Sequence, residues 1–175
     1  MSEVLHTMVL AVAAADAADT GNTANASITR SVPFTLFETE PPGHGDDEAS
    51  RAYASQRAKI HTAAGGVALV LRRADGDGEG DSGAGKVLSA HVQPGLEPGD
   101  QPLTLTWVIR KSPNPGRAYD IARIGGDLVA AYYQSLRDEG FPRDNIDLAE
   151  SIVKRRSQGC IFATMPLEDV RDYVD

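Results

Sequence analysis

Gly80-Asp-Ser-Gly-Ala-Gly85-Lys86 is the stretch of the chain whose residue types and spacing come closest to a known chemical task. Its Gly-x-x-x-x-Gly-Lys pattern is that of a phosphate-binding loop, which holds a nucleotide with backbone N–H groups and the lysine. That task also needs Ser or Thr after the lysine to hold magnesium, and a helix that presents further N–H groups. Here Val87 takes the hydroxyl position and a strand-like segment follows. We therefore assign no nucleotide binding to this stretch.

The same residues are similar to two other short motifs. Four acidic residues alternate as oxygen ligands do in a calcium loop: Asp75, Asp77, Glu79 and Asp81. An EF-hand needs a glutamate at its twelfth position, where this chain has Lys86. Gly80–Gly83 resembles the nucleophile stretch of chymotrypsin-like proteases, but that all-β fold does not suit a chain with several helical segments. We interpret residues 74–85 as a flexible, solvated hairpin loop, because Gly and Asp dominate them.

Metal and cofactor chemistry find no support in the remaining candidate ligands. The histidines show no His-x-x-x-His spacing, and the single cysteine lies near none of them in sequence: His6, His44, His61, His91 and Cys160. Cys160 begins an apolar strand, where a small core residue is the simpler interpretation. We expect no metal site and no cofactor.

A turn flanked by three cations is the best candidate ligand site. Arg110, Lys111 and Arg117 surround a proline-containing turn that precedes the longest expected helix. The first N–H groups of a helix have no partner within it, so its N-terminus attracts anions. The alternative is that the cations only offset an acidic surface. We name these three residues as the candidate site for an anionic small molecule.

The order of elements around this turn is similar to that of the acetyl-coenzyme A-dependent N-acetyltransferases. In both, helical material is followed by three antiparallel strands, a turn and a long helix, here over residues 67–140. The resemblance implies pyrophosphate binding by an Arg/Gln-x-x-Gly-x-Gly/Ala motif. The nearest match, Arg117-Ala-Tyr-Asp120-Ile-Ala122, has Asp120 in place of the first glycine. We do not assign the chain to this family, and we retain an acyltransferase-like enzyme as the alternative function.

Composition restricts the partners. The net charge of −8 disfavours binding to nucleic-acid phosphates. No apolar run approaches the roughly 18 residues that a membrane span needs. A single cysteine excludes an internal disulfide, and residues 1–17 lack the basic start of a secretory signal. We predict a cytoplasmic protein. Residues 3–18 suit a helix, but the apolar run Val4–Val12 suits a strand equally, and a weak signal segment remains an alternative.

Periodicity and breakers predict the elements. Strands are expected at 28–38, 67–73, 86–92, 104–110 and 160–165, and helices at 46–64, 119–139, 148–157 and 167–175. Gly125 and Gly126 inside the long helix each cost about 1 kcal/mol relative to alanine, which suggests close packing against another backbone or a bend. Short connections between three consecutive strands favour antiparallel pairing.

These elements predict a single α+β domain over residues 1–175, with a largely antiparallel sheet of about five strands and helices on one face. Because no catalytic constellation is complete, we predict a non-catalytic protein-binding or assembly module of an intracellular complex. Its partner is another protein or a second copy of itself. The apolar segment Val4–Val12 and the strand at 160–165 are the two segments expected to pair with it.

Overall fold

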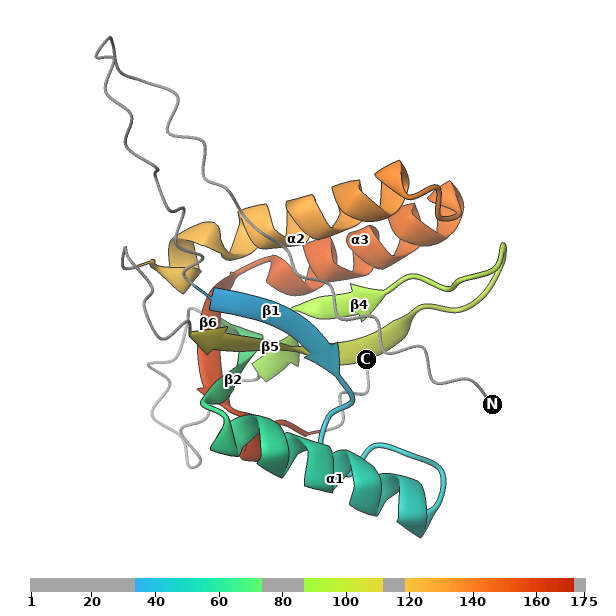
Figure 1. Cartoon of the computed structure of the whole chain (residues 1–175). Coiled ribbons are helices and arrows are strands. Elements are labelled where there is room, and N and C mark those ends of the chain that lie inside the picture. Colours follow the sequence, from blue (N-terminus) through green and yellow to red (C-terminus); the bar gives the residue numbers. More distant parts are fainter. Residues whose placement is uncertain (1–33, 74–86, 112–118, 172–175) are drawn as a thin grey trace, which may run out of the picture.

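The computed structural model describes residues 34–73, 87–111 and 119–171, which form a single α+β domain (Figure 1). The elements are β1 (Phe34–Thr39), α1 (Glu48–Ala63), β2 (Gly66–Arg73), β3 (Val87–Ser89), β4 (His91–Gln93), β5 (Leu103–Lys111), α2 (Ile121–Asp138), α3 (Arg143–Ser157), β6 (Cys160–Pro166) and a 3-10 turn at Leu167–Asp169. The predicted α+β class is confirmed. The predictions for residues 3–18 and for the loop at 74–85, with its phosphate- and calcium-like patterns, lie outside the described residues.

The sheet has six strands in this part of the chain, and every pair is antiparallel. β5 is paired with β1 along one edge and with β2 along the other, and β6 pairs with β2 from Val67 to Arg73. The expected strand at 86–92 is divided in two: β3 pairs with β2, and β4 pairs with β5. The chain therefore changes partner at Ala90, in the opening where β2 and β5 diverge.

Helices cover both faces of the sheet, which corrects the expectation of one covered face. In Figure 1 α2 and α3 lie on one side of the sheet and α1 lies on the other. Leu69 and Leu71 of β2 pack in the cluster that contains α2 and α3, while Ala68 and Val70 pack with Ala58 of α1. The sequence of β2 indicates this arrangement, because Val67–Leu71 is an unbroken apolar run. A strand buried on both faces is apolar throughout, whereas a strand with one exposed face alternates.

The helix boundaries follow local capping chemistry. The side chain of Asp47 accepts a hydrogen bond from the Ser50 N–H at 2.7 Å and begins α1. Gly140 adopts a φ of +86° directly after α2, a conformation that glycine reaches without a Cβ clash. α3 begins at Arg143, earlier than the expected 148, and the expected C-terminal helix is only a 3-10 turn within the described residues.

Gly125 is the point of closest approach between α2 and β6. A Cβ atom at Gly125 would overlap the ring and Cβ of Phe162, whereas a Cβ at Gly126 would meet nothing within 4 Å. Close packing is therefore found at the first glycine, against the side chain of Phe162 rather than against another backbone as predicted, and it is absent at the second. Phe162 packs into the α2–α3 side of the core through this contact.

Candidate functional site

The cation-flanked turn is only partly described. Arg110 and Lys111 end β5, opposite Thr35 and Phe34 of β1, and both side chains are exposed. Arg117 lies outside the described residues, so the predicted anion site stays a prediction. Asp120, which interrupts the acetyltransferase-like motif, has a structural role. It is the N-cap of α2, and its side chain accepts a hydrogen bond from the Ala122 N–H at 3.0 Å.

A buried histidine–glutamate pair is the most unusual polar group in the described core. The Nε2 atom of His91 lies 2.6 Å from Oε2 of Glu38. The His91 side chain is fully buried, while the Glu38 side chain is 20% exposed and reaches the surface. Buried ionisable groups cost free energy unless they are hydrogen-bonded or paired, so the contact with Glu38 lowers the cost of burying the His91 imidazole.

Strand geometry brings the two residues together. Glu38 follows Phe34 and Leu36 at strand spacing, so all three side chains point to the α2–α3 side of the sheet. His91 is the first residue of β4. Just before it, at Ala90, the chain stops pairing with β2 and begins to pair with β5. The Ser89 hydroxyl bridges the interruption, accepting from the His91 N–H at 3.1 Å and donating to the Leu105 carbonyl at 2.5 Å. This bridge fixes the backbone from which the His91 side chain enters the core.

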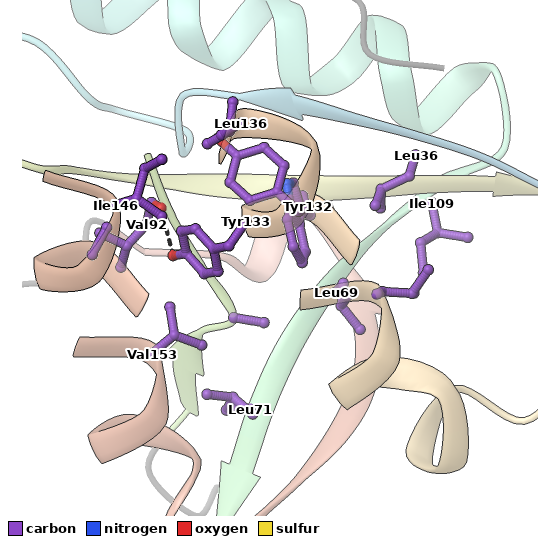
Figure 2. Packing of buried hydrophobic residues seen from close by; sticks show 14 of the residues in the cluster. Leu36, Leu69, Leu71, Val92, Ile109, Tyr132, Tyr133, Leu136, Ile146 and Val153 are labelled. Atoms are coloured by element: carbon purple, nitrogen blue, oxygen red, sulfur yellow. Dashed lines mark hydrogen bonds between the residues drawn. The ribbon is translucent and has the colours of Figure 1, made fainter. Parts of the chain in front are cut away.

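Aromatic rings enclose the imidazole. Trp107 stacks on His91 with ring centroids 4.5 Å apart and 15° between the planes. Tyr132 of α2 meets His91 edge-on at 4.9 Å and Trp107 edge-on at 5.3 Å. Figure 2 shows the adjacent Tyr133 reaching Val92, whose carbonyl accepts a hydrogen bond from its hydroxyl at 2.8 Å. The His91 imidazole is therefore packed between two aromatic rings inside the core.

Burial determines the charge of the pair. Desolvation lowers the pKa of His91, and the nearby Glu38 carboxylate offsets only part of that effect. The Nδ1 atom is buried and has no hydrogen-bond partner among the described residues, so a proton there would be an unpaired buried donor. His91 is therefore neutral and donates its Nε2–H to Glu38.

The Glu38 carboxylate forms one wall of a surface hollow of about 340 Å³, a volume that includes the part open to solvent. Tyr132, Glu139 and Gln93 also line it, and the remaining lining residues are apolar: Pro94, Leu96, Leu136 and Phe141. Burial next to the Glu38 carboxylate raises the pKa of the Tyr132 hydroxyl, with further contributions from Tyr133 and Glu139. The lining of the hollow thus includes two acidic residues and four apolar ones.

The loop after β4 contributes Pro94 and Leu96 to the lining of the hollow. The side chain of Asn145 on α3 holds this loop by three hydrogen bonds. Asn145 is 5% exposed. Its Nδ2 atom donates to the carbonyls of Gly95 at 2.9 Å and Glu97 at 2.7 Å. Its Oδ1 atom accepts from the Gly99 N–H at 3.3 Å. Pro94 and Leu96 are therefore held in place before any ligand arrives.

Sequence reasoning did not identify this site. The sequence offers His91 only as a candidate metal ligand, and Glu38 lies 53 residues away from it along the chain. A usable signal was present at both positions, because each is a polar residue at a place where strand alternation points into the core. No spacing rule connects residues on β1, β4 and α2, so only the fold shows that they meet.

No protein family, curated protein or solved structure matches this chain. Within residues 34–73, 87–111 and 119–171, no group of three or more His, Cys, Asp or Glu side chains is placed to hold a metal ion. None of the helices described is long and apolar enough to cross a membrane. The site must therefore be interpreted from its own chemistry.

Proposed function

We propose that the protein is a non-catalytic assembly module, and that the edge strand β6 is where it joins its partner. The observation that carries the proposal is that all seven residues of β6, Cys-Ile-Phe-Ala-Thr-Met-Pro, are uncharged. Natural edge strands are commonly protected by lysine, by other charges or by covering segments, because their free N–H and C=O groups pair with other chains. β6 has none of the charged protection.

The edge is long enough to accept another strand. β6 pairs with β2 at seven successive positions, and β2 is its only strand partner in the part of the chain that the structure describes. In an antiparallel ladder alternate residues direct their backbone groups to the opposite side, where an added strand would bond them. Ile161 on this strand is 50% exposed, which provides an apolar contact for the incoming chain.

A second copy of the chain is the partner that fits this edge best. Two β6 strands related by a twofold axis run antiparallel, so each copy presents the same surface to the other. The net charge of −8 opposes association over most of the surface. An uncharged strand is where two copies approach at the lowest electrostatic cost. We therefore propose self-association through β6.

Introducing a charge on this edge is expected to abolish self-association. Ile161→Lys places an ammonium group where the second strand would pack, at a side chain that is already half exposed. Wild-type protein should show a mass above one chain by light scattering as its concentration rises, and Ile161→Lys should remain a monomer. Leu148→Lys is the matched control, because Leu148 is similarly exposed, at 42%, but belongs to α3 rather than to β6.

Backbone hydrogen exchange gives an independent test of the same proposal. The outward amides of β6 should exchange more slowly in concentrated than in dilute wild-type protein, and at the same rate in Ile161→Lys at both concentrations. A wild-type protein that stays monomeric, with β6 exchange unaffected by concentration, rules out this function.

The acyltransferase alternative is separable by a ligand test. Coenzyme A at ~100 times its dissociation constant should raise the stability by about 2.7 kcal/mol if the enzyme alternative is correct, and Arg117→Ala should remove that gain. We also propose a cytoplasmic setting, because the only cysteine, Cys160, is a free thiol.

A further inference from the structure

We propose that opposite charges at the two ends of β6 select a second copy of the chain as its partner and fix the direction in which the two strands pair. The proposal rests on the assembly function proposed above and goes beyond it, because it assigns the residues that discriminate between partners. The basic end of one copy, which carries Arg72 and Arg73, attracts the acidic end of the other, which carries Glu168 and Asp169.

The charge of the chain changes sign across β6. The nine residues before the strand, 151–159, contain three basic residues and no acidic one. The nine residues after it, 167–175, contain four acidic residues and one arginine. β6 itself is uncharged from Cys160 to Pro166. Because the whole chain has a net charge of −8, the basic segment stands out against the rest of the molecule.

The fold places four exposed cations at the basic end of β6: Arg72, Arg73, Lys154 and Arg155. The two arginines of β2 lie opposite the first residues of β6, with Arg73 facing Cys160 and Arg72 facing Ile161. The other two cations belong to the last turn of α3, which leads into β6. In the part of the chain that the structure describes, none of the four forms an ion pair. Their charge is therefore available to an incoming chain.

The acidic end of β6 also has charge to offer. Leu167 is buried and begins a 3-10 turn directly after the strand, and the next two residues, Glu168 and Asp169, are exposed. Neither carboxylate forms an ion pair with another described residue. Arg171 lies beside the turn, where its guanidinium donates to the backbone carbonyls of Glu168 and Val170. The two carboxylates outnumber this one cation.

Twofold symmetry brings the unlike ends together. Two β6 strands paired in this way run antiparallel, so the start of one strand lies beside the end of the other. Because the joined sheet is continuous, the axis is perpendicular to it and the α1 sides of both copies share one face. Arg72 is on that face, since it follows Ala68 and Val70 at strand spacing. Leu167 of the acidic turn packs in the same cluster, so the unlike charges meet on one side of the joined sheet.

The attraction does not require one particular ion pair. Neighbouring strands are only about 4.8 Å apart, and unlike charges attract over a Debye length of about 8 Å at physiological salt. The acidic residues within 75–81 belong to the connection from β2 to β3, and β3 pairs with β2 on the side away from β6. A strand that approaches β6 in the opposite direction with the same flanking charges is repelled at both ends, which favours the antiparallel copy.

The test uses two charge-reversed variants of the full chain. One is Arg72→Glu/Arg73→Glu, and the other is Glu168→Lys/Asp169→Lys. Each variant alone has like charges at both junctions, so its dimer dissociation constant should rise about tenfold over that of the wild type in sedimentation equilibrium at low salt. An equimolar mixture of the two has unlike charges at both junctions, and it should form a heterodimer with close to wild-type affinity.

The two variants also serve as controls for each other. Glu168→Lys/Asp169→Lys makes the chain less negative, so a general charge effect would strengthen its self-association rather than weaken it. High salt should reduce the differences between the variants and the wild type. All four side chains are exposed, so both variants should keep the wild-type melting temperature.

The outcomes separate this inference from the assembly function on which it rests. If the wild type dimerises and both variants dimerise as tightly, or if the mixture forms no heterodimer, the charged ends do not select the partner and this inference is overturned, while pairing through β6 stands. A wild type that stays monomeric overturns both. Weakened self-association in each variant and recovery in the mixture support the proposal.

Discussion

Gly125→Ala is expected to lower the free energy of unfolding by about 2 kcal/mol, although alanine is the better helix former. The added methyl group would overlap Phe162 on β6, and one of the overlapped atoms is the Phe162 Cβ. A Cβ is fixed by its backbone, so the ring cannot relieve the overlap by rotating. The helix and the strand must move apart instead. Urea or thermal unfolding measures the loss.

Gly126→Ala is the matched control for this prediction. A Cβ at Gly126 meets nothing within 4 Å, so only the helix propensity changes. This variant should gain about 0.5–1 kcal/mol of stability. If both alanine variants change stability by the same amount and in the same direction, the close contact between α2 and β6 does not exist as described.

Acid is expected to destabilise the protein through His91. Its pKa in the folded chain lies below the ordinary histidine value of 6.5, chiefly because of burial. The unfolded chain therefore binds a proton at a higher pH than the folded chain does. The stability contribution is complete above pH 6.5 and is lost as the pH falls below it, with a slope approaching about 1.4 kcal/mol per pH unit.

His91→Gln isolates this contribution. The Gln side chain retains an N–H donor toward Glu38 and has no proton to gain in this range. Between pH 7.5 and 5.5 the wild type should lose more stability than His91→Gln does. The pKa of His61 is also lowered, but that group is common to both proteins and cancels in the difference. Parallel stability–pH curves for the two proteins would contradict the proposed neutral, buried imidazole.

Local chemistry made much of the fold predictable. Asp47 capping α1 and Gly65 and Gly140 ending helices act within a few residues, so the sequence indicates them directly. The antiparallel direction of the strands also followed from short connections. The placement of the helices on two faces required a different observation. It depended on recognising β2 as apolar throughout, which the expectation of helices on one face of the sheet did not take into account.

The hollow could not be predicted in the same way. Glu38, His91 and Tyr132 come from three elements and meet only because β4 leaves β2 and pairs with β5 after Ala90. That interruption has no strong sequence signal, since Ser-Ala-His inside a strand is unremarkable. The candidate anion site at Arg110, Lys111 and Arg117 differs from the hollow, because the sequence indicates it and the structure describes only part of it. Its cations are evident in sequence, but Arg117 lies outside the described residues, and the site remains a prediction.

The pairing of β2 with β6 also restricts the order of events during synthesis. Val67 is opposite Pro166, so the two strands of this pair leave the ribosome roughly a hundred residues apart. Until β6 appears, one side of β2 has no partner, and the apolar row from Val67 to Leu71 is available to other nascent chains. Contacts of such long sequence separation form late. The period before β6 is made is therefore when this protein is most exposed to aggregation and most in need of a chaperone.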